Sequence, residues 1–196
     1  MLAIPNDCKS ALNTTKTGWF KFYRSVAGTL QSLGRDADAL TLTEEGISFH
    51  QNALQQSLES QESNGESPEL HEEALAQNYW DLGNIQYHRG NYTEAIISFT
   101  RARDIIIKLF GEENSKTADS YLSVGVTQNL VGNYTAALES AQRALNIRIK
   151  LFGEEHSDTH YSYQLVGITQ YSLRDYTAAL ESHKRALDIR IKLMDW

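Results

Sequence analysis

Cysteine and proline are scarce in this sequence of 196 residues. Cys8 is the single cysteine, so no disulfide can form within the chain, and we expect a reducing compartment. Only two prolines and twelve glycines are present, which is compatible with a mostly helical fold because both residue types disfavour helix. With 41 % hydrophobic residues, the chain is long enough to bury a substantial core.

An excess of positive charge and long apolar runs are absent as well. The formal net charge is −7, which argues against nucleic acid as the main partner because phosphate binding needs a concentrated basic surface. No apolar run approaches the length of a membrane span, and the N-terminal residues lack a signal-peptide core. We therefore expect a cytoplasmic protein that binds neither nucleic acid nor membrane.

Residue groupings typical of an active site are absent from the sequence. His156 and His160 have the spacing that can present two metal ligands on one helix face, but no third ligand accompanies them. The simpler interpretation is one residue in a linker and one on the surface. No glycine-rich phosphate loop occurs, and no serine or cysteine is grouped with an oriented base. The sequence therefore predicts a protein that is not an enzyme and has no cofactor and no metal site.

A repeated pattern fills the C-terminal part of the chain. Residues 91–113 and 133–155 are nearly identical, and the same pattern resumes at residue 175. Tyr92, Tyr134 and Tyr176 are each 42 residues apart. A fixed period in this range indicates a solenoid, in which each unit buries its apolar face only by stacking on the next.

Each repeat has the pattern of two helices joined by a tight turn. Apolar residues recur at helical spacing up to Val131, and Gly132 can adopt the positive φ that ends a helix. We expect Asn133 to cap the second helix, a role worth about 1 kcal/mol relative to alanine. In the last repeat Arg174 replaces the turn glycine, so that turn is either strained or differently shaped.

Small residues recur inside these helices. Gly83, Gly125 and Gly167 fall in mid-helix, where glycine costs about 1 kcal/mol relative to alanine. A cost incurred three times at one position of the repeat indicates that two helices approach closely there. The small residues expected to oppose the glycines on the second helix are Ala95, Ala137, Ala179, Ala102, Ala144 and Ala186.

This arrangement resembles the tetratricopeptide repeat (TPR), whose consensus has a glycine in its first helix and alanines in its second. Gly125, Tyr134, Ala137 and Ala144 stand at the matching positions, and Tyr92 and Tyr176 repeat the tyrosine. The period of 42 residues and the LFGEE linker resemble the kinesin light chain and nephrocystin type of repeat. The resemblance implies an all-α solenoid of antiparallel helix hairpins that forms a right-handed superhelix.

The sequence divides into four regions. We predict a flexible lead-in over residues 1–16, a degenerate TPR-like hairpin over 17–58, a polar linker over 59–69 and three repeats over 70–196. The repeats span about residues 74–115, 116–157 and 158–196. An unrelated helical hairpin is the alternative for residues 17–58. The last helix lacks the polar outer face of a solenoid end, so we expect a longer array, or a partner or second copy on that helix.

In the TPR family, five positions of each first helix line a concave groove that holds a peptide or a helix. Aromatic side chains among them have the character of binding hot spots. For Trp80 and Tyr87, packing against the preceding hairpin is the alternative. The positions that the resemblance assigns to this partner groove are Gln77, Trp80, Asn84, Tyr87 and His88 in repeat one, Asp119, Leu122, Val126, Asn129 and Leu130 in repeat two, and Tyr161, Gln164, Ile168, Tyr171 and Ser172 in repeat three.

The function that the resemblance implies is a non-catalytic scaffold or adaptor that binds a protein or peptide, and kinesin light chain-like cargo adaptation is one form of it. The alternative is the sensing or oligomerising region of a larger signalling protein with a nucleotide-binding module. Basic residues at the ends of the second helices, Arg148, Lys150, Arg190 and Lys192, allow two interpretations: compensation of the helix dipole, or a ridge that binds an acidic partner.

Overall fold

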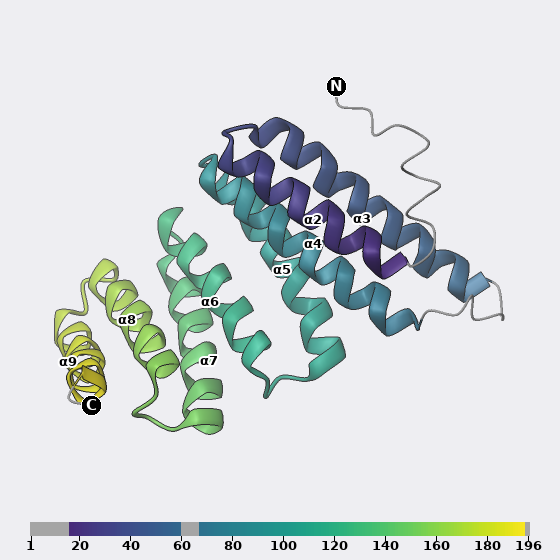
Figure 1. Cartoon of the computed structure of the whole chain (residues 1–196). Helices are drawn as coiled ribbons and strands as arrows, with labels where there is room; N and C mark the ends of the chain where they lie inside the picture. Colours follow the sequence, from purple (N-terminus) through teal and green to yellow (C-terminus); the bar gives the residue numbers. More distant parts are fainter. Residues whose placement is uncertain (1–15, 60–66, 195–196) are drawn as a thin grey trace. The chain divides into compact units, whose positions relative to one another are not determined.

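The computed structural model describes residues 16–59 and 67–194, and every regular element within them is an α-helix. The chain divides into two units, residues 1–90 and 91–196, and each is described by itself (Figure 1). The first unit contains α2 (Lys16–Ser32), α3 (Asp36–Glu59) and α4 (Pro68–His88). The second contains α5 (Tyr92–Phe110), α6 (Ser115–Leu130), α7 (Tyr134–Phe152), α8 (Ser157–Ser172) and α9 (Tyr176–Met194).

In the first unit α3 packs against both α2 and α4. A small apolar core forms where Leu30, Ala39 and Ile85 meet. Beside it, His50 and His71 face each other with their Nδ1 atoms 3.1 Å apart, and both side chains are buried. Burial, and secondarily the neighbouring His71, lowers the pKa of His50 from 6.5 to about 4. His50 is therefore neutral at pH 7.

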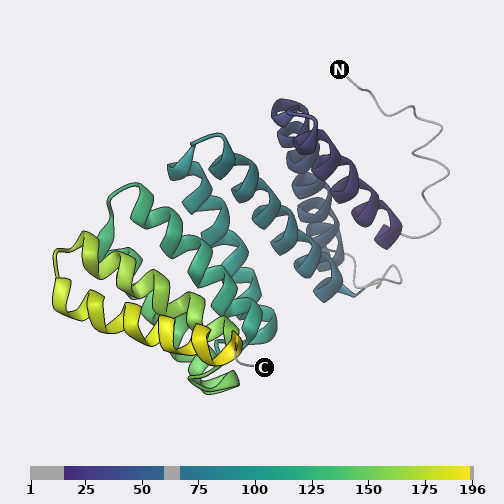
Figure 2. The ribbon, with the colours of Figure 1, turned by 60° about the vertical axis from the view of Figure 1, so that its left-hand side comes forward.

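In the second unit each helix packs against the next along the chain, from α5 to α9, and α6 also contacts α8 (Figure 2). This order follows from the sequence because short turns join antiparallel neighbours. Ala141 and Leu145 of α7 form one core cluster with Leu165 and Val166 of α8. The middle hairpin (α6–α7) and the C-terminal hairpin (α8–α9) are therefore continuous through the α7–α8 interface.

The turns inside the two hairpins have the same backbone geometry. Gly132 has φ 80° and Arg174 has φ 65°, so arginine adopts the left-handed conformation that glycine adopts one repeat earlier. The next amide donates to the carbonyl five residues back in both turns, Asn133 to Gln128 and Asp175 to Gln170, each at 2.9 Å. Of the two possibilities left open by the sequence, the structure has a strained turn of unchanged shape.

The helix caps differ from the expectation. Asn133 precedes α7 at the N-cap position, but its side chain makes no capping hydrogen bond, and Asn91 before α5 behaves in the same way. Side-chain caps occur before three other helices: Asn114 accepts from the amide of Lys116 before α6, His156 accepts from Asp158 before α8, and Asp175 accepts from the amide of Ala178 before α9. The predicted capping by Asn133 is wrong because its backbone, with ψ 65°, lies outside the extended conformation from which a cap reaches the helix.

The mid-helix glycine of the middle hairpin lies against two helices. A Cβ added at Gly125 would lie 3.2 Å from both Ser140 Cβ and Leu165 Cδ2, and 3.3 Å from the carbonyl oxygen of Ala137. Gly83 and Gly167 are buried as well. The six alanines expected to oppose the glycines are each at most 3 % exposed: Ala95, Ala137, Ala179, Ala102, Ala144 and Ala186.

The fold class predicted from the sequence is confirmed, because the described residues form antiparallel helix hairpins that repeat at 42 residues. The right-handed superhelix and the repeat boundaries stay predictions. Residues 1–15 and 60–66, which contain most of the expected lead-in and linker, lie outside the described residues.

Candidate partner-binding face

The fifteen residues predicted to line a groove lie on three helices. Five lie on α4 in the first unit, five on α6 and five on α8 in the second unit. The five on α4 belong to the first unit and are described by themselves. The candidate site is therefore the face that α6 and α8 share, two helices that contact each other.

Apolar and aromatic side chains are exposed along this α6–α8 face. On α6, Val126 is 36 % and Leu130 48 % exposed. On α8, Ile168 is 46 % and Tyr171 63 % exposed, and the ring of Tyr171 lies edge-on to that of Tyr176. The N-terminal half of α8 adds Tyr161, which is also exposed. Exposure of these residues along adjacent helices is unusual for surfaces that bind nothing.

The α6–α8 face has almost no free charge. Its single carboxylate, Asp119, accepts a hydrogen bond of 2.5 Å from Arg148 Nη2. The remaining polar members are half-buried amides and a hydroxyl, Asn129, Gln164 and Ser172. Asn129 Oδ1 is buried and has no hydrogen-bond partner among the described residues. A surface of this kind matches an uncharged, apolar segment better than an acidic or basic one.

Three of the predicted groove residues on α4, Gln77, Tyr87 and His88, contact residues of the same helix. Gln77 donates to Asp81 Oδ1 at 3.1 Å, and Tyr87 packs edge-on against His88. Trp80, Asn84 and Tyr87 are half-buried, whereas His88 is exposed. Burial raises the pKa of Asp81, although its ion pair with Arg24 at 3.2 Å opposes the shift.

The two histidines that have metal-ligand spacing bind different partners. His156 uses Nδ1 to cap α8, and His160 is buried with its Nδ1 2.7 Å from the carbonyl oxygen of Ala186 on α9. His160 is therefore not a surface residue, as the simpler interpretation had it, but a tie between α8 and α9. Among the described residues, no three His, Cys, Asp or Glu side chains cluster closely enough to hold a metal ion.

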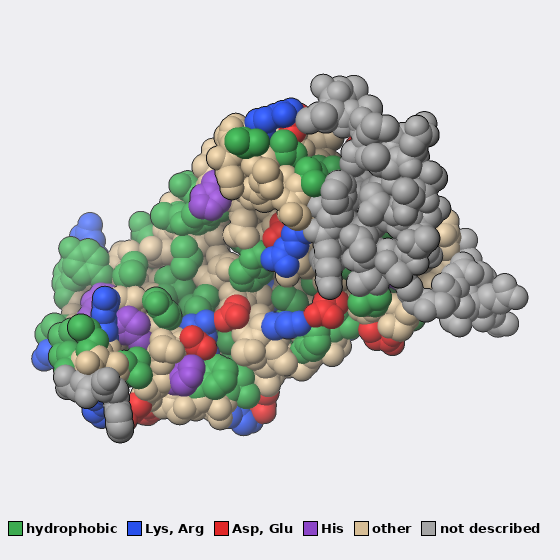
Figure 3. All heavy atoms as spheres, viewed as in Figure 1, with side chains coloured by type: hydrophobic (Ala, Val, Ile, Leu, Met, Phe, Trp, Pro, Cys, Tyr) green, Lys and Arg blue, Asp and Glu red, His purple; other side chains and the backbone are tan. Residues whose placement is uncertain are grey.

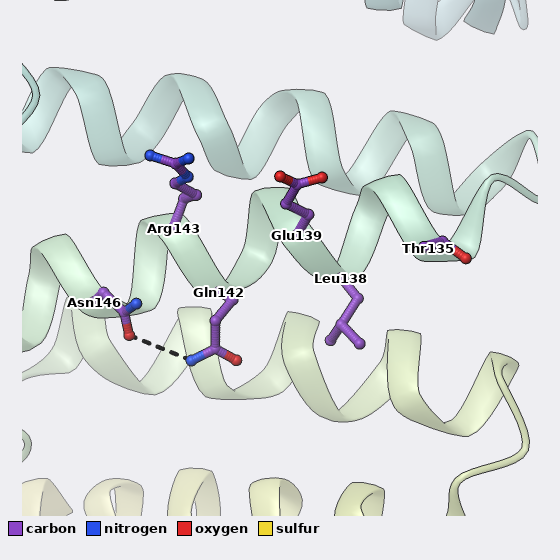
Figure 4. Close-up of a pocket in the computed structure, with 6 residues that line it drawn as sticks. All are labelled: Thr135, Leu138, Glu139, Gln142, Arg143 and Asn146. Atoms are coloured by element: carbon purple, nitrogen blue, oxygen red, sulfur yellow. Dashed lines mark hydrogen bonds between the residues drawn. The ribbon is translucent and has the colours of Figure 1, made fainter.

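Two depressions in the surface are lined by residues outside the predicted groove. One of about 420 Å³ is lined by residues of α7, with Glu139 and Arg143 on one side and Leu138 and Gln142 on the other (Figure 4). Another of about 280 Å³ lies between the α7–α8 turn and α9. Both are rimmed by charged side chains and neither contains a predicted groove residue.

Comparison with known families finds a repeat model in the same part of the chain. Residues 72–148 and 124–192 match the model of the tetratricopeptide repeat, and together these matches cover more than half of the chain. The protein belongs to the tetratricopeptide repeat family. No curated protein matches the sequence significantly. Proteins of this family generally act as interaction scaffolds and not as enzymes.

Solved structures share the TPR fold at low sequence identity. BtubC (BKLC) from P. vanneervenii has a TM-score of 0.75 at 19 % identity, over 95 % of this chain and 69 % of that one. RapI in its apo form also has a TM-score of 0.75, at 14 % identity, over 97 % of this chain and 63 % of that one. This TPR chain thus spans less than two thirds of RapI.

The predicted type of repeat is confirmed at the level of fold. TPR-like repeats of a putative kinesin light chain from Podosopora anserina have a TM-score of 0.57 at 14 % identity, over 90 % of this chain and 97 % of that one. In the described part of this TPR protein, no helix is long and apolar enough to cross a membrane.

Side-chain hydrogen bonds between the two TPR helices of a hairpin recur at the 42-residue period. They were not predicted from the sequence. Ser140 donates to Gln128 at 2.9 Å in the middle hairpin, and Ser182 donates to Gln170 at 2.7 Å in the C-terminal one. These bonds fix α6 on α7 and α8 on α9, and so position the α6–α8 face. The signal available in the sequence was the repetition itself, because both pairs recur with unchanged spacing.

Of the two interpretations of the basic residues at the helix ends, a ridge of free charges is not supported, because three of the four residues are paired with carboxylates. Arg148 is buried and bound to Asp119, while Lys150 pairs with Glu113 and Lys192 with Glu155. Among the four, only Arg190 is exposed without a carboxylate within ion-pair distance among the described residues.

Proposed function

We propose that this protein is a non-catalytic scaffold that binds an apolar segment of another protein, as a peptide or a helix, along the α6–α8 face. The observation that carries this proposal is the exposure of Val126, Ile168 and Tyr171 on two adjacent first helices of TPR hairpins. Exposed apolar and aromatic side chains of this kind contribute most of the binding energy in protein interfaces.

The charge of the face supports one class of ligand. Asp119 is already paired with Arg148, so a ligand that brings a charged group to this face finds no free counter-charge among the ten residues on α6 and α8. Burying such a group would cost more than it returns. Capture therefore favours a segment whose contacting side chains are apolar, with backbone groups that bond to the amides of Asn129 and Gln164.

The experiment is a selection of peptides from a random display library on the full chain, followed by binding measurements with two matched variants. Ile168→Asp alters the α6–α8 face, whereas Ile97→Asp alters an isoleucine of similar exposure on α5, 46 % against 50 %. We expect Ile168→Asp to weaken the selected peptides by about tenfold or more and Ile97→Asp to leave them unchanged. Equal loss in both variants, or none in either, rejects the face as the binding site.

The identity of the partner determines which more specific function the scaffold has. We retain kinesin light chain-like cargo adaptation in the cytoplasm as one form, supported only by the resemblance of the repeats. The alternative is a sensing or oligomerising region of a larger signalling protein. Tyr171→Ala and Asn129→Ala discriminate between them, because they remove partner capture in an adaptor and leave self-association intact in a regulatory region.

A further inference from the structure

Two buried histidines meet in the interface between α3 and α4. His50 of α3 is 5 % exposed and His71 of α4 is 6 % exposed, and their Nδ1 atoms lie 3.1 Å apart. Two other histidines, His88 and His183, are exposed, and Figure 3 shows histidine side chains at the surface in purple. Because imidazole ionises close to neutral pH, burial of this pair makes the contact between the two helices depend on protonation.

The same interface contains a polar atom without a partner. Nδ2 of Asn78, on α4, is buried and makes no hydrogen bond with any described residue. It lies against α3, because a Cβ added at Gly46 would be 3.0 Å from this nitrogen. A buried donor without an acceptor weakens the contact that buries it. The α3–α4 interface is therefore less well satisfied than the apolar cluster that joins α7 to α8.

The position of His50 in its hairpin corresponds to that of Arg148 in the middle hairpin. The two residues are 98 positions apart, and the same offset places Gly34 on Gly132, which end their helices with φ 70° and 80°. Arg148 is also buried, and its Nη1 donates to Ser162 Oγ of the next helix at 3.2 Å. Both second helices thus use a buried nitrogen-bearing side chain at this position to contact the helix that follows.

The two side chains differ in how they respond to pH. The guanidinium of Arg148 stays protonated at any pH that a protein meets, and Asp119 is its counter-ion. His50 is neutral at pH 7, since burial, and secondarily His71, lowers its pKa to about 4. The charge at this position can therefore change in the α3–α4 interface but not in the α7–α8 interface.

The titratable groups on the packed helices do not favour a proton on His50. Arg24 of α2 is paired with Asp81 of α4 at 3.2 Å, and the hydroxyl of Tyr79 on α4 accepts a hydrogen bond from Gln51 at 2.9 Å. No carboxylate is among the causes that set the pKa of His50. The other described acidic residues near these positions of α3 and α4 are exposed or half-buried: Glu44, Glu45, Glu69, Glu72 and Glu73.

We propose that the α3–α4 interface is an acid-sensitive joint, which holds the α2–α3 hairpin on α4 at neutral pH and releases it when His50 takes up a proton. Release uncovers an apolar surface of α4, because Ile85 loses its contacts with Leu30 of α2 and Ala39 of α3. The joint lies in the first unit and is independent of the α6–α8 face.

The direction of the pH effect follows from the two states of His50. Its pKa is about 4 in the closed interface and returns to 6.5 when opening brings the ring into water. The open form binds more protons between these two values, so opening becomes more favourable as the pH falls from 6.5 to 4. The closed form is most stable above pH 6.5. The ratio of open to closed molecules should be about twentyfold higher at pH 5 than at pH 7.

The experiment is amide hydrogen exchange of the full chain at pH 7 and pH 5, corrected for the intrinsic pH dependence of the exchange rate. Amides of α3 and α4 report opening, because helices without tertiary contacts are marginal in water. Helices α5, α6 and α7 contain no histidine and are the internal reference. We expect protection of α3 and α4 to fall about twentyfold relative to the reference. Equal changes in both sets of helices overturn the proposal.

Two matched variants assign the effect to His50. His50→Gln removes the titrating group and keeps a polar side chain, so we expect protection of α3 and α4 to become independent of pH relative to the reference. His88→Gln, the same change at an exposed histidine of α4, should leave the pH dependence intact. Dependence that survives in His50→Gln contradicts the assignment. NMR titration of the wild-type imidazoles needs no variant, and a His50 ring that titrates near pH 6.5 in the closed form overturns the proposal as well.

Discussion

The middle hairpin (α6–α7) and the C-terminal hairpin (α8–α9) have the same interior and different exteriors. Both keep the glycine, the alanines and the serine–glutamine bond that hold their two helices together. They differ at positions on their outer surfaces. Ala141 and Asp119 of the middle hairpin correspond to His183 and Tyr161 of the C-terminal hairpin. The difference shows that the 42-residue pattern specifies the hairpin, whereas the positions that face a neighbour specify what the hairpin binds.

The largest expected effect of this difference concerns a matched pair of leucines. Leu145 is 4 % exposed and Leu187 is 55 % exposed at the same position of the repeat. We expect Leu145→Asp to destabilise the protein by about 4 kcal/mol, because it buries a carboxylate in an apolar cluster. Leu187→Asp should change stability by less than about 0.5 kcal/mol. Urea denaturation measures both, and similar losses would mean that α9 is covered in solution.

The mid-helix glycines give the next largest effect. Gly125→Leu is expected to cost more than about 2 kcal/mol, because its side chain meets Ser140, Leu165 and the backbone of Ala137. Gly167→Leu should cost less, since the nearest atoms there belong to the exposed imidazole of His183, which can rotate away. Thermal unfolding of the two variants tests the order, and a neutral Gly125→Leu would place that glycine away from the helix interface.

The two arginines at one repeat position should also differ. Removal of Arg148 leaves Asp119 without its counter-ion and Ser162 without a donor, so we expect Arg148→Ala to cost about 2 kcal/mol. The figure is below that of a fully buried ion pair because the Asp119 side chain is 53 % exposed. Arg190→Ala should cost less than about 0.5 kcal/mol. Equal costs in chemical denaturation would indicate an additional partner for Arg190.

The smallest effect is a gain in stability at the hairpin turn. Arg174 occupies a left-handed conformation at φ 65°, whereas Gly132 occupies it at φ 80°. Arg174→Gly is therefore expected to stabilise the protein by about 1 kcal/mol, and Gly132→Ala to destabilise it by a similar amount. A rise in the melting temperature of the first variant checks the sign, and a fall would show that the arginine side chain stabilises the turn by other contacts.

The sequence predicted the hairpins well because the 42-residue repeat shows the small interior residues three times and the turn glycine twice. It also signalled Arg174, since a non-glycine at a glycine position marks strain. The burial of Arg148 was not predictable from its place at a helix end, because its partners Asp119, Asp158 and Ser162 come from two other helices. The capping by Asn114 and His156 depends on turn geometry that the repeat pattern does not state.

The candidate site was predicted by analogy with the family, position by position. The structure places Val126, Ile168 and Tyr171 on an exposed face of two contacting helices. This exposure agrees with the helical period, because residues at helical spacing lie on one side of a helix. It also shows that Asp119, assigned to the same stripe, is paired with Arg148. That pairing depends on how α6 and α7 are aligned along each other, and the spacing of residues within one helix does not give this alignment.

Methyl NMR of the full chain during titration with a library-selected peptide tests the central claim most directly. The proposed scaffold predicts progressive shifts of the Val126 and Ile168 methyl signals, with the Ile97 signal of α5 unchanged. Shifts at Ile97 or on the outer face of α9, with Val126 and Ile168 unmoved, would contradict partner binding along the α6–α8 face.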